Sequence, residues 1–166
     1  MRIIAGDARG IQLDAGPQEA VRPTTDRVKE SVFNIIGDIE GCIVVDIFAR
    51  SGALGLEAFS RGAEEVYFIE KDRMTCKIIT KNLKKVEKAT GDAEHCKILQ
   101  TDYKSIPNRL TTVQPDFILA DPPYDNNCAM AIDLLADKSL AEWAGEGCIL
   151  CLEHLSNTIL PEDSPW

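Results

Sequence analysis

Four consecutive residues, Asp-Pro-Pro-Tyr at 121–124, directly follow an apolar run that is typical of a buried strand. Two successive prolines remove two backbone donors and hold the chain in a rigid, extended corner. The Asp121 carboxylate and the Pro122 carbonyl are then adjacent acceptors, as the two N–H donors of an exocyclic amino group require. Tyr124 offers an aromatic face on which an unstacked base can lie. We therefore expect Asp121, Pro122, Pro123 and Tyr124 to be catalytic residues that act on an amino group.

Acidic residues also stand at the ends of three earlier strand-like runs. Glu70 follows Asp46 by 24 residues, a distance at which an acid can accept hydrogen bonds from both ribose hydroxyls of a nucleotide. Asp102 is placed to receive an adenine amino group. A single such acid could be a helix cap or a solvated charge, but three together indicate an adenosine-containing cofactor. The expected cofactor-binding residues are Asp46, Phe48, Ala49, Ser51, Gly52, Gly55, Glu70 and Asp102.

The turn after Asp46 contains small residues but no Gly-x-Gly-x-x-Gly. Small residues let a ligand approach the backbone amides at the start of a helix. The missing glycine pattern argues against a nicotinamide-dependent oxidoreductase, which would also leave Asp-Pro-Pro-Tyr unexplained. A simple turn after the strand remains the alternative for that tetrapeptide, and its position beside three acids argues against it.

The elements that must position these residues follow a regular alternation from Cys42 onward. Strands are expected at 43–48, 65–70, 97–100, 116–120 and 147–153, and helices near 53–61, 72–88, 103–110 and 128–141. Near-continuously apolar strands that alternate with helices predict a parallel sheet covered on both faces. We therefore predict a doubly wound α/β domain over residues 38–166. Its ligands should bind beyond the carboxyl ends of the strands.

Residues 1–37 are expected to form a small N-terminal extension made of a hairpin and a helix. Two apolar stretches, 2–5 and 11–13, flank a glycine-containing turn, which is typical of a hairpin. Thr24 or Thr25 can cap the helix that follows. The apolar stripe of that helix is expected to consist of Val28, Val32, Phe33, Ile35 and Ile36.

The charge of the 166-residue chain is strongly acidic, with 18 basic and 27 acidic residues and a net charge of −9. This balance argues against a sequence-independent nucleic-acid binder with a large basic face. Residues 1–37 hold five basic and five acidic residues, so the remainder carries the whole net charge. The N-terminal segment is therefore the expected place of any RNA contact, unless its charges are simply solvated. The expected RNA-binding residues are Arg2, Arg9, Arg22, Thr24 and Arg27.

The six cysteines are expected to be reduced and to serve as small core residues. Cys148 and Cys151 with His154 resemble part of a zinc site, but no second ligand pair stands at a suitable spacing, so no metal is expected. No run of about 18 apolar residues and no secretory signal is visible. We expect a cytoplasmic protein without a membrane contact.

In their order and spacing these residues resemble the bacterial 16S ribosomal RNA guanine-N2 methyltransferase D family over nearly the whole chain. The matching pieces are Met1-Arg2-Ile3-Ile4-Ala5-Gly6, Arg9-Gly10, Arg22-Pro23-Thr24, Asp26-Arg27-Val28-Lys29-Glu30, Asp46-Ile47-Phe48-Ala49, residues 51–58 and 60–63, Glu70 and Asp121-Pro122-Pro123-Tyr124. The resemblance implies a class I methyltransferase Rossmann-like fold and S-adenosylmethionine as cofactor. It also implies methyl transfer to the 2-amino group of one guanine in 16S rRNA, either naked or in a small-subunit assembly intermediate, with the N-terminal segment helping to hold the RNA.

Arg50 departs from the family pattern, which has glycine at this position. If the position has a positive φ, arginine there costs about 1–2 kcal/mol, and its side chain could occupy the cofactor site. Alternatively, the guanidinium could pair with the methionine carboxylate of the cofactor. Of the two outcomes, impaired cofactor binding is the one that we expect.

The second departure is that only 12 residues follow His154, whereas family members continue into a further helix and two strands. We expect the C-terminal strands of the sheet to be missing and the fifth strand to be an apolar edge, so that the protein is a monomer or pairs with a second copy through that edge.

Two other functions stay open. One is methylation of an adenine amino group or a protein glutamine, and the other is a degenerate, inactive homologue kept as an RNA-binding or assembly factor.

Overall fold

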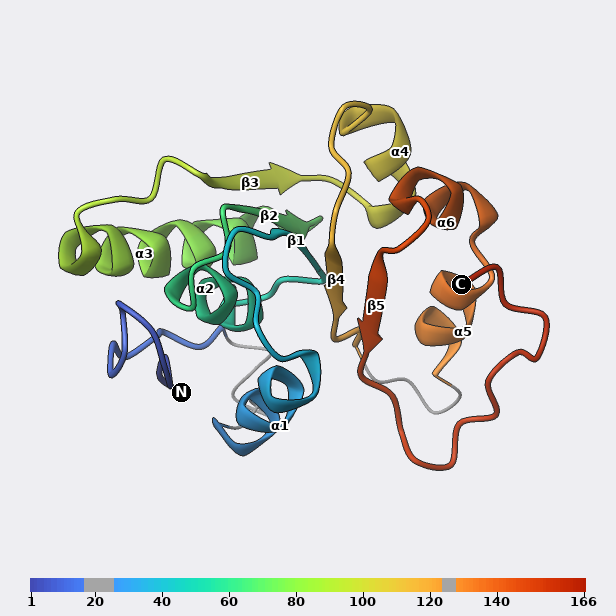
Figure 1. Cartoon of the computed structure of the whole chain (residues 1–166), viewed down its shortest axis with the longest axis horizontal. Coiled ribbons are helices and arrows are strands. Elements are labelled where there is room, and N and C mark those ends of the chain that lie inside the picture. The colour runs from blue at the N-terminus through green and yellow to red at the C-terminus, as the bar shows by residue number, and fades with distance from the viewer. Residues whose placement is uncertain (17–25, 124–127) are drawn as a thin grey trace.

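In this computed structural model, which describes residues 1–16, 26–123 and 128–166, one parallel sheet forms the centre of the molecule (Figure 1). Its strand order is β3-β2-β1-β4-β5, so the predicted doubly wound α/β fold is confirmed. Every predicted strand is present, with bounds that agree to within two residues. The strands are β1 (Ile43–Ile47), β2 (Glu65–Glu70), β3 (Cys96–Gln100), β4 (Phe117–Ala120) and β5 (Ile149–Leu152).

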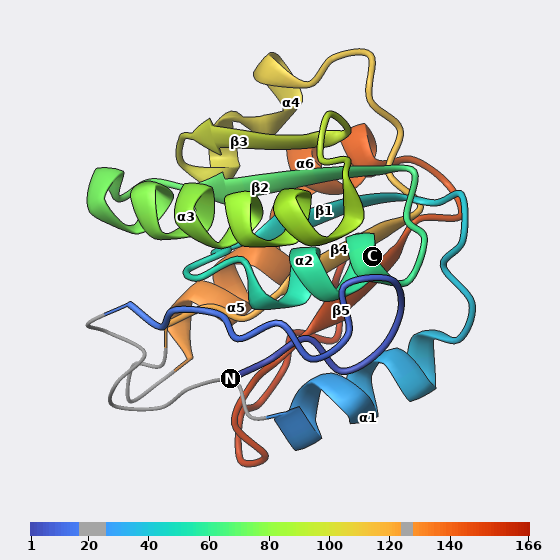
Figure 2. The same ribbon diagram turned by 90° about the vertical axis from the view of Figure 1, so that its left-hand side faces the viewer.

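The two faces of the sheet are covered by different helices, because successive strand residues point to opposite sides. Val44 and Phe68 belong to the buried cluster under α2 (Ala53–Ser60) and α3 (Arg73–Thr90). Val45 and Ile69 belong to the cluster on the other face. That face is covered by a 3₁₀ turn (Tyr103–Ser105), α4 (Ile106–Arg109), α5 (Ala129–Leu135) and α6 (Lys138–Ala144), as Figures 1 and 2 show.

The sequence predicted one helix over 128–141, and the structure has two. Helix α5 ends at Leu135, and Asp137 caps α6, because its carboxylate accepts a hydrogen bond from the N–H of Leu140 at 3.0 Å. Such a cap satisfies one of the free donors at a helix start. The break turns α6 so that Leu140 and Ala144 pack into the same buried cluster as Leu134.

The N-terminal segment is packed on the α2 face of the sheet. A single antiparallel bridge joins Arg2 to Gln12, and the Ile3 N–H donates to the Ile11 carbonyl at 3.0 Å. Helix α1 (Asp26–Ile36) contributes Phe33 to the same buried cluster as Ile3. The predicted apolar stripe of this helix was wrong at one position, since Ile35 is 83% exposed.

Lys29 is the second buried residue of α1, beside Phe33, and 0% of it is exposed. Its ammonium lies 3.5 Å from a Glu57 carboxylate oxygen and donates to the Arg2 carbonyl. Glu57, also fully buried, accepts the N–H groups of Ile4 at 2.8 Å and Ala5 at 3.0 Å, and Arg61 Nε at 2.8 Å. Burial lowers the pKa of Lys29, and the charge of Glu57 opposes that shift. This ion cluster fastens the N-terminal segment and α1 to α2.

Gly6 completes the attachment. Its φ is +77°, and a Cβ atom there would lie 1.5 Å from the Ser60 carbonyl oxygen. The Ser60 carbonyl accepts the Asp7 N–H at 2.8 Å, and its hydroxyl accepts the Ala8 N–H at 2.9 Å. Several positions of the family pattern, Gly6, Lys29, Glu57, Ser60 and Arg61, therefore fix the N-terminal segment to the sheet domain.

Strand β5 forms one edge of the sheet, and Ile149 on it is 53% exposed. After β5 the described chain forms no further strand and turns back over α5, where the Trp166 indole N–H donates to the Leu134 carbonyl at 3.3 Å. Pairing of this edge with a second copy stays a prediction.

All six cysteines are free thiols, and Cys148 and Cys151 pack on opposite faces of the sheet. Burial raises the pKa of Cys96 to about 12 and that of Cys148 to about 11. Among the described helices, none has the length and apolar character needed to cross a membrane.

Candidate active site

The loop after β1 makes a tight turn into α2. Phe48 and Arg50 both have positive φ angles, 61° and 50°, and Gly52 has a φ of 78°. Such angles are strained for residues other than glycine. Asp46, 2% exposed, accepts the Gly55 N–H at 2.8 Å. This hydrogen bond ties the end of β1 to the first turn of α2.

Gly55 is required for packing. A Cβ atom at Gly55 would lie 2.4 Å from Cε1 of Phe68 on β2. Ser51, Gly52 and Gly55 are all buried, and the Ser51 carbonyl accepts Asn82 Nδ2 at 2.9 Å. These small residues therefore let α2 and α3 approach the sheet closely. Their expected role in letting a ligand reach the backbone amides stays a prediction.

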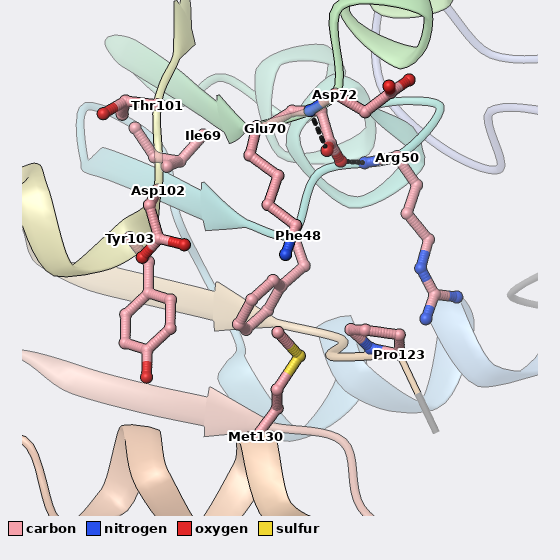
Figure 3. A pocket seen from close by; sticks show the side chains of 11 residues that line it. Phe48, Arg50, Ile69, Glu70, Asp72, Thr101, Asp102, Tyr103, Pro123 and Met130 are labelled. Carbon is pink, nitrogen blue, oxygen red and sulfur yellow. Dashed lines mark hydrogen bonds between the residues drawn. The ribbon is translucent and has the colours of Figure 1, made fainter. Parts of the chain in front are cut away.

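A cavity of about 110 Å³ lies beyond the carboxyl ends of β2 and β3. Figure 3 shows the rings of Phe48 and Tyr103 and the thioether of Met130 along its apolar side, with Glu70 and Asp102 above them. Its lining consists of Phe48, Arg50, Ile69, Glu70, Lys71, Asp72, Thr101, Asp102, Tyr103, Pro123 and Met130. An apolar slot with a few directed acceptors is typical of a site for a planar, polar-edged group such as a nucleobase.

Glu70 is held in place by two backbone donors. One carboxylate oxygen accepts the Arg50 N–H at 3.2 Å and the other accepts the Asp72 N–H at 2.9 Å, as the dashed lines in Figure 3 show. Each carboxylate oxygen has two lone pairs, so one on each oxygen remains for a ligand. Glu70 is therefore an oriented acceptor pair at the end of β2.

Asp102 lies at the end of β3 and begins the 3₁₀ turn, where one carboxylate oxygen accepts the Lys104 N–H at 3.0 Å. The Tyr103 hydroxyl donates to Asp133 at 2.6 Å, and its ring meets that of Phe48 edge-on with centroids 5.3 Å apart. Burial, together with the Asp133 hydrogen bond, raises the pKa of Tyr103. Tyr103 therefore stays protonated and stiffens the wall of the cavity beside Asp102.

Asp121 lies next to this cavity, at the end of β4, and only 5% of it is exposed. Its carboxylate forms an ion pair of 3.2 Å with the guanidinium of Arg50. Around this pair only about 10 Å³ of space is open, lined by Asp46, Phe48, Ala49, Arg50, Ala53, Leu54 and Asp121. Figure 3 shows the Arg50 side chain reaching from its loop toward Pro123. The conditional expectations for Arg50 are thus met: its φ is positive and its side chain fills part of the site.

Seven of the twelve predicted catalytic and cofactor-binding residues come together. The two adjoining cavities are lined by the predicted residues Asp46, Phe48, Ala49, Glu70, Asp102, Asp121 and Pro123. Pro122 is buried and lines neither cavity. Tyr124, Arg22 and Thr24 lie outside the described residues. Arg2, Arg9 and Arg27 are exposed, and Arg2 pairs with Asp26 at 3.3 Å.

Sequence reasoning missed several lining residues. Lys71, Asp72, Thr101 and Tyr103 each lie within three residues of a strand end, so the same argument that found Glu70 could have found them. Met130 lies on α5, and no sequence signal connects it to the site.

Comparisons with known proteins agree with this fold. The family model described as conserved hypothetical protein 95 matches residues 1–166. The ribosomal RNA small subunit methyltransferase D of Haemophilus influenzae is 36% identical over 170 residues, covering 100% of this chain and 84% of its own. The protein of the same name from Escherichia coli K12 is 34% identical over 163 residues, covering 97% and 78%.

A solved structure of the candidate methyltransferase yhhF from Escherichia coli superposes with a TM-score of 0.72 at 30% identity, covering 98% of this chain and 86% of that one. A precorrin-6y C5,15-methyltransferase from Geobacter metallireducens superposes with a TM-score of 0.67 at 14% identity, covering 90% and 71%. The second likeness concerns the fold alone.

Proposed function

Because the chain belongs to the ribosomal RNA small subunit methyltransferase D family, we propose that it transfers a methyl group from S-adenosylmethionine to the exocyclic 2-amino group of a guanine in 16S rRNA. The names of both relatives state that they are ribosomal RNA methyltransferases. The exocyclic amino group is proposed from the Asp121 corner, and the choice of guanine in 16S rRNA rests on the family resemblance.

The residues present fit the nucleoside part of S-adenosylmethionine. The slot between Phe48 and Met130 can hold an adenine ring, the Asp102 carboxylate can accept its amino group, and the Glu70 oxygens can accept two ribose hydroxyls. The methionine end would extend toward Asp46 and Asp121. There the Arg50 side chain must change its position, because the open space is about 10 Å³. When bound, the cofactor supplies an electrophilic methyl group.

The corner after β4 can hold the amine that receives this methyl group. The Asp121 carboxylate and the Pro122 carbonyl accept its two N–H donors, which leaves the nitrogen lone pair directed toward the cofactor side of the site. A neutral amine needs no strong base before it reacts, so positioning supplies much of the catalysis. The excess proton on the methylated nitrogen then passes to Asp121 or to water.

The observation that carries the proposal is the position of this corner. Asp121, nearly buried at the end of β4, adjoins a cavity whose wall carries the oriented Glu70 carboxylate at the end of β2. In parallel α/β sheets this edge is where cofactor and substrate meet.

A second candidate function is supported by the Arg50–Asp121 ion pair. If Arg50 keeps Asp121 occupied, the protein acts without methyl transfer, as an RNA-binding factor in small-subunit assembly.

Both candidates are tested by incubating the purified chain with tritiated S-adenosylmethionine and small-subunit rRNA, either naked or in partly assembled particles, and analysing the digested nucleosides by mass spectrometry. We expect N2-methylguanosine with wild type and its loss in Asp121→Asn, which keeps the shape but removes the charge. Methyladenosine, or label in protein, would refute the guanine assignment. Bound RNA with no label under any condition would favour the assembly factor.

A further inference from the structure

Helix α3 has one strongly basic face. Arg73, Lys77, Lys81, Lys84 and Lys88 are all exposed, and their spacing of four, four, three and four residues places them along one side of the helix. The opposite side holds the buried Cys76, Ile79, Asn82 and Val86. We call the five exposed cations the α3 basic face.

The α3 basic face carries a net charge opposite in sign to that of the whole chain. Helix α3 holds six of the 18 basic residues and one of the 27 acidic residues. Its net charge is therefore +5, in a chain whose net charge is −9. A localised positive region on an acidic protein attracts a polyanion to that region, while the surrounding surface repels it.

Part of the basic charge is used within the protein. Asp14 lies 2.6 Å from the Lys81 ammonium and 2.8 Å from that of Lys85, and these hydrogen bonds lower the Asp14 pKa to about 2. Lys85 also donates to the Gln12 carbonyl at 3.0 Å. These contacts hold the N-terminal segment against α3, and Figure 2 shows that segment (dark blue) below the helix.

The other cations of the face differ from Lys81 in this respect. Within the described ranges, no carboxylate oxygen lies within 4.0 Å of the side-chain nitrogens of Arg73, Lys77, Lys84 or Lys88. These four exposed cations can therefore exchange their small counterions for phosphates at little structural cost.

The face begins at the candidate active site. Asp72, the N-cap of α3, lines the cavity together with Lys71. From there the helix runs for 18 residues, or about 27 Å at the usual rise per residue. In Figure 2, α3 crosses in front of the sheet, on the side of the molecule that faces the viewer, and the five cations of its basic face are exposed.

We propose that the α3 basic face binds the phosphate backbone of the RNA substrate and leads that strand to the strand-end edge, where the Asp121 corner adjoins the cofactor cavity. The proposal rests on the proposed function for the identity of the RNA. It differs from the sequence expectation, which placed RNA contacts on the N-terminal arginines. An acidic protein is a poorer candidate partner for this face, because the cores of protein interfaces need aromatic and apolar groups. On α3, Met74 is the one large apolar side chain that is strongly exposed, at 64%.

The experiment compares Lys77→Gln/Lys84→Gln with a matched control, Arg109→Gln/Lys138→Gln. The control residues are exposed on α4 and α6, across the sheet. The probe is a fluorescein-labelled 16S rRNA transcript, whose dissociation constant is measured by anisotropy from 50 to 200 mM salt without cofactor. The slope of log affinity against log salt should fall in magnitude by about 1.4 for two lost single-strand phosphate contacts, with weaker binding at every salt concentration. The control should keep the wild-type slope.

Equal slopes in the two double variants would overturn the proposal. So would an α3 variant that loses binding to labelled polyglutamate but keeps its rRNA slope, since that pattern identifies an acidic protein as the partner. If the α3 variant loses the slope while wild type methylates no nucleoside, the surface assignment stands and the proposed function fails. Normal methylation by wild type with an unchanged slope in the α3 variant would support the proposed function and overturn the surface assignment.

Discussion

Replacing Arg50 by glycine should strengthen the binding of S-adenosylmethionine by about tenfold. The guanidinium of Arg50 lies 3.2 Å from Asp121, and the two side chains are 18% and 7% exposed. A hydrogen bond between such charged groups contributes about 1.5–3 kcal/mol, which must be given up if the side chain leaves. Because Arg50 also gains new contacts when it moves, we take a net effect of about 1.4 kcal/mol, which corresponds to a factor of ten.

The backbone adds a separate effect, on stability. Arg50 has a φ of 50°, which costs a non-glycine residue about 1–2 kcal/mol, whereas glycine adopts it freely and loses about 0.5–1 kcal/mol of unfolded-state entropy. Both Arg50→Gly and Arg50→Ala lose the ion pair with Asp121, so the backbone effect is the difference between the two variants. Arg50→Gly should melt up to about 3 °C above Arg50→Ala, while both gain cofactor affinity.

Isothermal titration calorimetry with S-adenosylmethionine and with adenosine separates the possible outcomes. Adenosine lacks the methionine end, so its affinity should be equal in wild type, Arg50→Gly and Arg50→Ala. The reasoning would be refuted if both variants bound S-adenosylmethionine more weakly than wild type while adenosine was unaffected. That result would show that Arg50 pairs with the methionine carboxylate.

Three further predictions concern the attachment of the N-terminal segment. Lys29→Met should lower the free energy of unfolding by about 3 kcal/mol, because the buried Glu57 loses a cation; urea denaturation measures this, and a change below about 1 kcal/mol would contradict it. Gly6→Ala should lower the free energy of unfolding by about 1–3 kcal/mol or more, because the new methyl group would clash with the Ser60 carbonyl. An unchanged urea midpoint would show that the turn can relax. Asp14 has a folded pKa of about 2, below its ordinary 3.8, so it stabilises the fold above about pH 4 and loses this effect as the pH falls toward 2. The difference in melting temperature between wild type and Asp14→Asn should therefore be largest near pH 6 and vanish near pH 2, and a difference that persists at pH 2 would exclude the charge effect.

The sheet and the strand-end acids could be predicted because their signals are local. Apolar runs such as Phe117–Ala120 are long enough to define a buried strand, and the carboxyl ends of parallel strands necessarily share one edge. That rule alone is enough to bring Glu70, Asp102 and Asp121 to adjoining cavities.

What could not be predicted depends on partners distant in sequence. Lys29 looks like a solvated residue on α1, because nothing local reveals Glu57, 28 residues away. Ile35 was assigned to the core by periodicity alone and is exposed instead. The packing role of Gly55 could not be predicted either, since the Phe68 ring that restricts it lies on the next strand.

The Glu57 cluster also determines whether the hairpin and α1 can be separated from the sheet domain. A single carboxylate joins the first turn of the hairpin, α1 and α2, through the amides of Ile4 and Ala5 and the cations of Lys29 and Arg61. Cutting the chain ahead of β1 would leave the Glu57 carboxylate buried without most of its partners. The hairpin with α1 is therefore not a transferable module that could be grafted onto another methyltransferase, and heating should melt it and the sheet in one cooperative calorimetric transition.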